Sequence, residues 1–281
     1  MTRPNPDFNS LSVPDSSQRK IPADVRAVFF DIDDTFFSHR LGRIPEGYLE
    51  MVQKLRKQGV FCALCTARSL ELSEILLGPQ NGLWDGVVAG NGACVYDENQ
   101  NVLFCKTLDP HTIEALIETG RKHDAGFFVS GSQAFVFDNT KYYQPKLDSI
   151  HTPVLPRHAW TPEQSLSVIS MCVPDPLALR KELDALDGLF VHYTKYSADI
   201  SRDDLSKFEG ISRLMKHWNL PEHAYAAFGD SFNDLDMLDN AACPVAMAEG
   251  EQTALDRYPA HTPPVEEGGI AAWMKAQGWI E

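Results

Sequence analysis

The sequence of 281 residues has no apolar run long enough to span a bilayer, and basic residues are few beside the acidic ones. Lys and Arg number 25 against 39 Asp and Glu, which gives a formal net charge of −14. A surface of this charge repels nucleic acids and anionic membranes. We therefore expect neither of them as a partner. An anionic substrate would need a bound cation to offset the repulsion.

The sequence also lacks the cysteine spacing of a zinc ribbon. Cys62 and Cys65 form a C-x-x-C, but no second pair follows at the required distance. The segment around them, residues 60–66, is typical of a buried strand. We predict buried, reduced thiols for all six cysteines. They are Cys62, Cys65, Cys94, Cys105, Cys172 and Cys243.

The first twenty residues lack the apolar stretch of a signal peptide. They are polar and contain Pro4 and Pro14. We expect residues 1–23 to form a loose tail and the protein to be cytoplasmic.

Short apolar runs alternate with amphipathic stretches over much of the chain. The runs predict strands at residues 25–30, 60–65, 85–89, 225–228, 244–248 and around Ala260. The amphipathic stretches predict helices at residues 45–58, 69–77 and 233–239. This alternation predicts an α/β fold with a doubly wound, Rossmann-like and mostly parallel sheet.

The alternation is interrupted between residues 91 and 196. A hairpin, a strand, a helix and a further strand are expected there, at residues 127–137, 166–173, 176–186 and 189–193. We interpret residues 91–196 as an inserted α+β cap domain. The core then consists of residues 24–90 and 197–281.

Reactive side chains follow three of the predicted core strands. Ligands of open α/β sheets bind at the carboxyl ends of the strands, so we expect these side chains to share one crevice. Clustered carboxylates without nearby His or Cys favour Mg²⁺ over Zn²⁺, and Mg²⁺ commonly shares a substrate phosphate. A phosphate monoester therefore suits the crevice. The side chains are Asp31, Asp33, Thr66, Asp230, Asn233 and Asp234.

Four motifs in order resemble those of the haloacid dehalogenase-like phosphatases. Residues 31–35, DIDDT, resemble D-x-D-G-T, and Thr66 in residues 64–68 resembles the second motif, T-G-R. Lys207 in residues 204–210 resembles the third motif, and residues 229–234 match the fourth, G-D-x-x-N-D. The insert is similar to the large cap of the Cof-like branch. Residues 91–93 and 267–270 also resemble stretches of that branch.

Two positions depart from the family pattern. Asp34 and Ala67 stand where the family usually has glycine. Aspartate tolerates unusual backbone angles, so we expect the turn at Asp34 to survive.

The resemblance implies a role for each motif. Asp31 would be the nucleophile that forms an aspartyl-phosphate, and Asp33 would be the general acid and base. Thr66, Lys207 and Asn233 would bind and orient the phosphate.

The resemblance also implies a magnesium site. Asp31, Asp230, Asp234 and the backbone carbonyl of Asp33 would supply its ligands. Two further residues are candidates for substrate contacts. For Asn91, a turn formed with Gly92 is an equal alternative, and for Arg68 an exposed position is the favoured one. In the insert, surface or cap-core positions are expected for Lys141, Tyr142, Tyr143, His151 and Lys195.

These observations predict a Mg²⁺-dependent phosphatase for a small phosphorylated metabolite, such as a sugar phosphate or a phosphorylated cofactor. A phosphomutase with a similar cap is an alternative. A non-catalytic protein that binds a phosphorylated ligand is another. We expect a monomer or a small homo-oligomer.

Overall fold

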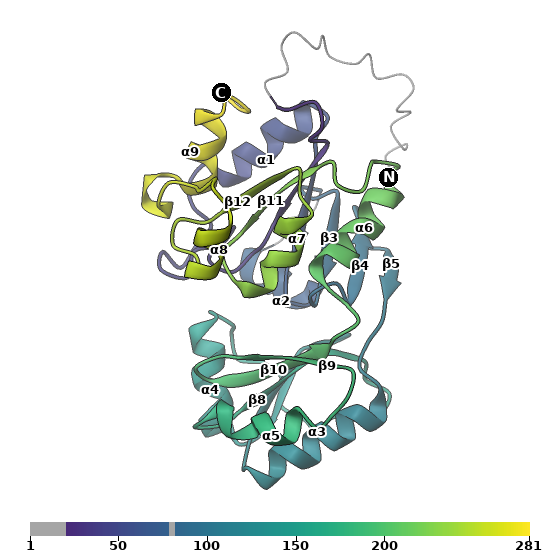
Figure 1. The fold of residues 1–281 in the computed structure, drawn as a ribbon. Helices are drawn as coiled ribbons and strands as arrows, with labels where there is room; N and C mark the ends of the chain where they lie inside the picture. Colours follow the sequence, from purple (N-terminus) through teal and green to yellow (C-terminus); the bar gives the residue numbers. More distant parts are fainter. Residues whose placement is uncertain (1–20, 79–81) are drawn as a thin grey trace.

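The computed structural model describes residues 21–78 and 82–281, so nearly all of the expected N-terminal tail lies outside the described residues. Two sheets organise the chain (Figure 1). One has seven strands in the order β12-β11-β1-β2-β3-β4-β5, and the other has five in the order β7-β6-β8-β10-β9. Within the described ranges, no helix combines the length and the apolar composition needed to cross a membrane.

The seven-stranded sheet is mostly parallel, as the sequence predicts. Strands β12, β11, β1, β2 and β3 run parallel, and β4 and β5 extend the sheet as an antiparallel hairpin. In place of the short strand expected around Ala260, the structure has an isolated bridge between Ala246 and His261. The strands are β1 (Ala27–Phe30), β2 (Phe61–Cys65), β3 (Gly86–Ala89), β4 (Cys94–Asp97), β5 (Val102–Cys105), β11 (Tyr225–Gly229) and β12 (Cys243–Ala246).

Helices cover both faces of this sheet, which confirms the doubly wound prediction. One apolar cluster joins the sheet to α1 (Tyr48–Lys57), α2 (Leu70–Leu77) and α9 (Gly269–Ala276). A second cluster joins the other face to α6 (Lys207–His217), α7 (Leu235–Asp239) and α8 (Gln252–Arg257). The short 3₁₀ turns η2 (Phe232–Asp234) and η3 (Val265–Glu267) precede α7 and α9.

Local sequence sets where two of these helices begin. The Ser69 side chain accepts a hydrogen bond from the amide of Leu72 and caps α2, as expected. Helix α1 begins at Tyr48 and not at Pro45, because Gly47 before it has φ 84°, outside the helical region.

The five-stranded sheet is antiparallel and belongs to the cap. Its strands are β6 (Gly126–Gly131), β7 (Phe135–Asp138), β8 (Leu166–Cys172), β9 (Leu189–Tyr193) and β10 (Ser197–Arg202). Helix α3 (Pro110–Lys122), η1 (Pro176–Leu179) and α5 (Arg180–Leu183) pack against one face. Helix α4 (Thr140–Ser149) packs beside β6 and β8. The helix expected at residues 176–186 is therefore split into η1 and α5.

Strand pairing differs from the expected bounds of the insert, residues 91–196. Strands β4 and β5 pair within the core sheet, and β10 pairs within the cap sheet. By this criterion the chain leaves the core after Cys105 and returns after Arg202. The sequence predicted no strand at β4, β5 or β10, and periodicity alone does not say which sheet a strand joins.

One cysteine pair corrects the expectation of six reduced thiols. Cys94 and Cys105 lie directly opposite each other on β4 and β5 and form a disulfide. Cys105 is exposed, so an apolar setting was the wrong interpretation for this residue. The free thiols of Cys62, Cys65 and Cys172 are buried, whereas that of Cys243 is partly buried.

Candidate active site

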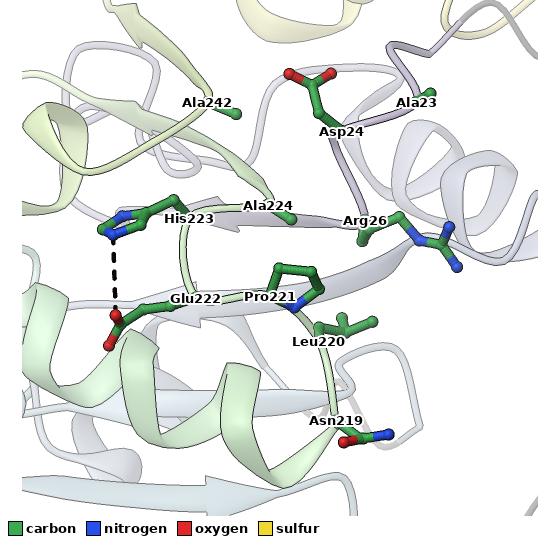
Figure 2. A pocket seen from close by; sticks show the side chains of 10 residues that line it. All are labelled: Ala23, Asp24, Arg26, Asn219, Leu220, Pro221, Glu222, His223, Ala224 and Ala242. Atoms are coloured by element: carbon green, nitrogen blue, oxygen red, sulfur yellow. Dashed lines mark ion pairs between the residues drawn. The ribbon is translucent and has the colours of Figure 1, made fainter.

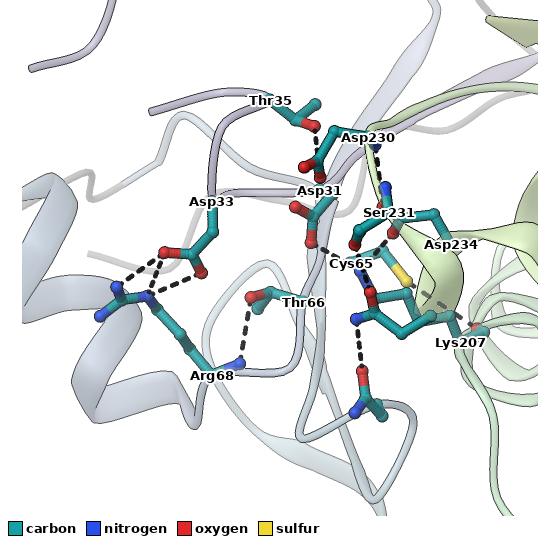
Figure 3. Close-up of polar contacts among 12 residues, drawn as sticks. Asp31, Asp33, Thr35, Cys65, Thr66, Arg68, Lys207, Asp230, Ser231 and Asp234 are labelled. Atoms are coloured by element: carbon teal, nitrogen blue, oxygen red, sulfur yellow. Dashed lines mark hydrogen bonds and ion pairs between the residues drawn. The ribbon is translucent and has the colours of Figure 1, made fainter. Parts of the chain in front are cut away.

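Three adjacent parallel strands deliver the reactive side chains to one edge of the core sheet. Asp31 follows β1, Thr66 follows β2, and Asp230 follows β11. Strand β1 pairs with both β2 and β11, so the three carboxyl ends lie side by side. Figure 3 shows their side chains converging at this edge.

A buried lysine is at the centre of the group. The Nζ atom of Lys207 lies 2.5 Å from Oδ1 of Asp31 and 2.5 Å from Oδ1 of Asp234. The side chains of Lys207 and Asp234 are fully buried. Lys207 is the first residue of α6, and the Ser206 side chain caps that helix by accepting from the amide of Glu209. This helix N-cap at Ser206 fixes the start of α6 and therefore where the Lys207 side chain enters the crevice.

The Asp234 carboxylate also organises the turn after β11. Its Oδ2 accepts hydrogen bonds from the amides of Asp230 at 2.9 Å and Ser231 at 3.0 Å. These bonds direct the Asp230 side chain toward Asp31. The Thr35 hydroxyl lies 3.5 Å from Oδ1 of Asp230 on the other side.

Burial and crowding of like charge change the acidity of these groups. Burial raises the pKa of Asp31 to about 8, the nearby Lys207 ammonium opposes the shift, and the Asp234 charge adds to it. Burial and the charges of Asp234 and Asp31 raise the pKa of Asp230 well above its ordinary value. Burial alone would lower the pKa of Lys207, but the charges of Asp234 and Asp31 raise it well above the usual range.

The same crowding provides a test of the expected magnesium site. One carboxylate oxygen from each of Asp31, Asp230 and Asp234 lies within 4.8 Å of the other two. One ammonium faces three carboxylates, so a divalent cation would offset the remaining negative charge. Oxygen-only ligands of this kind suit Mg²⁺. The residues present fit the metal that the sequence predicts.

Asp33 lies apart from the carboxylate cluster and is held by other partners. Arg68 binds it with two nitrogens, Nε at 2.9 Å from Oδ2 and Nη2 at 2.7 Å from Oδ1. The Nε2 atom of His39 lies 2.7 Å from Oδ1. Burial works to raise the pKa of Asp33, but the Arg68 charge and the bonds from His39 and Arg68 hold it well below its usual range. In this arrangement Asp33 is ionised.

Arg68 is buried, so the expectation of an exposed side chain is wrong. Its exposed fraction is 6%. Besides Asp33, the guanidinium donates to the carbonyl of Ile150 at 2.6 Å and to the hydroxyl of Thr152 at 3.3 Å. Both acceptors belong to the cap, directly after α4. Arg68 therefore connects the proposed general acid to the cap.

Thr66, Asn91 and Asn233 line the remaining side of the crevice. Thr66 is fully buried, and its hydroxyl oxygen accepts from the amide of Arg68 at 3.1 Å. The side chain of Asn233 donates to Oδ1 of Asn91 at 3.2 Å. Asn91 has φ 54° in a turn with Gly92, and its amide donates to the carbonyl of Thr66 at 3.0 Å. The expected turn at Asn91 is confirmed, whereas its contact with substrate stays a prediction.

Two histidines, His39 and His151, lie beside the site, and no sequence motif predicts this position. The Nδ1 atoms of His39 and His151 lie 2.8 Å apart, and their rings stack with centroids 4.9 Å apart. His39 belongs to the core and His151 to the cap. Asp34 supports the arrangement: it has φ 52°, and its carboxylate accepts from the amide of His39 at 2.9 Å. The sequence offered no spacing that would reveal this contact.

A cleft of about 120 Å³ lies where core and cap meet. The core contributes Asp33, Arg68, Asn91 and Asn233 to its lining. A larger hollow of about 660 Å³ is lined by residues before β1 and β11, among them Asp24, Arg26 and His223 (Figure 2). These residues precede the strands that Asp31 and Asp230 follow, so the larger hollow is at the opposite edge of the sheet. The smaller cleft, which Asp33 and Asn233 line, is therefore the candidate substrate cleft.

Fold and site together define a capped α/β enzyme with an acidic centre at the ends of its central strands. The chain belongs to the haloacid dehalogenase-like hydrolase family, whose model matches residues 28–274. The resemblance of the four motifs is thereby confirmed.

Known relatives cover most of the chain. YkrA of Bacillus subtilis is 25% identical, over 92% of this chain and 100% of YkrA. The 5-amino-6-(5-phospho-D-ribitylamino)uracil phosphatase YitU of the same organism is 22% identical, over 88% of this chain and 96% of YitU. The structure of the subclass IIB sugar phosphatase BT4131 superposes with a TM-score of 0.78 at 24% identity, over 91% of this chain and 100% of that chain. At this identity, the superposition demonstrates the shared capped fold.

Proposed function

We propose that this hydrolase is a Mg²⁺-dependent phosphatase that acts on a small phosphorylated metabolite through an aspartyl-phosphate on Asp31. The observation that carries the proposal is the cluster of Asp31, Asp230 and Asp234 around the buried Lys207 ammonium. Relatives named as phosphatases, such as YitU, support the reaction class.

In the first step, an Asp31 carboxylate oxygen attacks phosphorus. The bond from phosphorus to the leaving oxygen breaks, and Asp33 passes a proton to that oxygen, which leaves as an alcohol. Lys207 stabilises negative charge on the phosphoryl oxygens, and the Thr66 hydroxyl donates to one of them. Asn233, held by Asn91, orients the group from the opposite side.

In the second step, water attacks phosphorus of the aspartyl-phosphate. Asp33 takes the proton of the water, the bond between phosphorus and Asp31 breaks, and inorganic phosphate leaves. The ionised Asp33 of this structure suits the second step. For the first step Asp33 must gain a proton, which requires its contact with Arg68 to loosen. The link from Arg68 to the cap makes cap movement a direct means of loosening it.

Asp31, Asp230, Asp234 and the carbonyl of Asp33 would hold the magnesium ion. When bound, it supplies positive charge that offsets the repulsion between these carboxylates and an incoming phosphate dianion. The acidic protein as a whole provides no such charge.

The remaining proposals concern the surroundings of the reaction. The substrate is a small phosphate ester, because a folded protein surface could hardly enter a cleft of about 120 Å³ between core and cap. We propose a cytoplasmic protein that is a monomer or a small homo-oligomer. Size-exclusion chromatography with light scattering measures the latter directly.

The test is phosphate release from a panel of phosphate monoesters, with Mg²⁺ and with a chelator. Asp31→Asn should lose activity about a thousandfold or more, because no other carboxylate can replace the attacking oxygen. Asp24→Asn is the matched control, since Asp24 is exposed near the opposite end of β1. Acid-quenched protein should contain phosphate on the peptide with Asp31.

The same assay separates the alternatives. A phosphomutase would accumulate an isomeric phosphorylated product and little free phosphate. A binding protein would bind the esters without turnover. Phosphate release that persists in Asp31→Asn would contradict the proposal. Phosphate release that the chelator does not reduce would contradict it as well.

A further inference from the structure

The face of the cap sheet that lines the cleft carries several polar side chains. Cross-strand pairing sets Phe128, Ser170, Asp199 and His192 in one row across β6, β8, β10 and β9. The neighbouring row on the same face is Ser130, Val168, Ser201 and Phe190. All eight residues line the cleft that also contains Asp33.

The opposite face of the same strands is apolar. Ile169, Met171, Ala198 and Ile200 alternate with the polar residues and pack into the apolar cluster with α3 and α5. Burying hydroxyls and a carboxylate on a sheet face is unfavourable unless partners satisfy them. The polar face is therefore a feature that packing alone does not explain.

A buried ion pair lies on this polar face. Nζ of Lys146, on α4, lies 2.9 Å from Oδ2 of Asp199. The side chains of Lys146 and Asp199 are exposed by 10% and 20%, and both line the cleft. Ser197 donates to Oδ1 of Asp199 at 2.7 Å, and the Ser170 side chain also bonds to the carboxylate.

The Lys146 ammonium has more hydrogen-bond donors than its contact with Asp199 uses. An ammonium group carries three N–H donors. Among the described residues, the carboxylate of Asp199 is the hydrogen-bond partner of the Lys146 ammonium, which leaves donors for a molecule in the cleft. The proposed chemistry at Asp31 and Asp33 uses neither member of the pair.

The chemistry of the face selects a type of leaving group. A carboxylate on the leaving group would be attracted by Lys146 and repelled by Asp199, and an ammonium the reverse, so the pair as a whole favours neither charge. Neutral hydroxyls accept from Lys146 and donate to Asp199, and the serines can do either. Phe128 and Phe190 offer apolar surface to the C–H bonds of the same molecule.

We infer that Lys146, Asp199 and the serines beside them form a subsite for a neutral, polyhydroxylated leaving group, so that phosphorylated sugars or polyols are the substrate class. This inference rests on the proposed phosphatase function and narrows it. The cleft of about 120 Å³ between core and cap is small, so it suits a compact leaving group and not a long chain.

The experiment compares phosphate esters that differ in their leaving groups. Hexose, pentose and alditol phosphates are each paired with a deoxy analogue. Pyridoxal phosphate represents a planar heteroaromatic ester, and 4-nitrophenyl phosphate represents a leaving group without hydroxyls. The readout is the ratio of kcat/KM for the best polyol phosphate to kcat/KM for 4-nitrophenyl phosphate.

The variants are Lys146→Met, Asp199→Asn and the double change Lys146→Met with Asp199→Leu, which leaves no unpaired buried charge. We expect each to lower the ratio about tenfold or more, mainly through a higher KM for the polyol phosphate. Lys141→Met is the matched control, because Lys141 is an exposed lysine on the same helix. It should leave the ratio unchanged. Thermal melting checks that every variant folds.

Each outcome supports or overturns the inference. A preference for planar esters overturns the subsite and leaves the phosphatase proposal intact. So does an unchanged kcat/KM ratio in the Lys146 and Asp199 variants. If wild type hydrolyses no ester, the phosphatase proposal fails, and calorimetric binding of the polyol phosphates becomes the readout. Binding that Lys146→Met weakens about tenfold then supports the subsite. Binding that it leaves unchanged overturns it.

Discussion

The ammonium of Lys207 holds two carboxylates that come from distant parts of the chain. Replacing it by methionine leaves the fully buried Asp234 carboxylate without its counter-charge. In chelator, we expect Lys207→Met to lower the free energy of unfolding by about 3–5 kcal/mol. Urea unfolding measures the change. Lys216→Met, at an exposed position on the same helix, is the control. Equal stability of the two variants would contradict the central role of Lys207.

The raised pKa of Asp31 makes the metal-free protein depend on pH. The folded state keeps a proton on Asp31 up to about pH 8, whereas the unfolded chain releases it near the ordinary aspartate pKa of 3.8. The folded state therefore binds more protons in this window, and stability falls as pH rises through it. In chelator, the free energy of unfolding should fall between about pH 5 and about pH 8, by up to about 1.4 kcal/mol per pH unit. The melting temperature, which measures this change, should fall over the same range.

Asp31→Asn is the comparison for this pH series, because it removes the titrating group. Its melting temperature should fall less steeply, with a remaining slope from Asp230, whose pKa is also raised. Mg²⁺ should flatten the wild-type slope, since it favours the ionised carboxylates. Parallel slopes for the two proteins would show that Asp31 does not cause the dependence.

The sequence identified the site residues that follow predicted strands or lie in motifs. It did not identify contacts between the core and the cap. Asp31 and Asp230 follow predicted strands, so their convergence could be expected. Arg68 was expected at the surface because the sequence does not reveal that Ile150 lies over it. His39 escaped notice because its partner, His151, is 112 residues away.

The turn between β3 and β4 packs against the start of α6. Gly92 has φ 91°, and a Cβ there would lie 2.0 Å from the carbonyl oxygen of Ser206. Gly92→Ala should therefore displace Ser206 and the lysine after it. We expect lower kcat and a loss of more than about 1 kcal/mol in stability.

The chain offers a control that separates backbone strain from the clash. Gly59 has φ 75°, but a Cβ there would meet nothing within 4 Å. Gly59→Ala should cost stability with no effect on kcat. If both variants lose the same stability and keep kcat, the contact between Gly92 and Ser206 has no role in placing Lys207.

At the level of elements, apolar runs predicted the strands well but not their partners. The run at residues 225–228 became β11, and the hairpin at residues 127–137 became β6 and β7. Residues 94–105, in which no strand was predicted, fell within the expected cap, because pairing depends on tertiary packing that periodicity does not encode.

The net charge of −14 acts on the whole molecule. At the site, the charges of Lys207, Arg68 and the proposed divalent ion would balance those of Asp31, Asp33, Asp230 and Asp234. No net positive charge would then remain there to offset the repulsion from the rest of the protein. Added salt screens this repulsion. From about 10 mM to about 150 mM NaCl, kcat/KM for a dianionic ester should rise by roughly twofold. Stopped or continuous phosphate assays at fixed Mg²⁺ measure it.

A neutral-salt control distinguishes this effect from specific ion binding. KCl should give the same rise as NaCl at equal ionic strength. A fall in kcat/KM would show that a local positive field, and not the overall charge, governs the approach of substrate.

The insertion of the cap between the two halves of the core has a consequence for biosynthesis. Lys207 follows Asp31 by 176 residues, so at typical ribosomal rates of about 5–20 residues per second it is made about 9 to 35 seconds later. Every strand of the cap sheet is complete by Arg202, whereas the core sheet still awaits β11 and β12. The cap is thus the first sheet whose partners are all available to a nascent chain. Asp31 therefore meets the Lys207 ammonium only after the strands of the cap have left the ribosome.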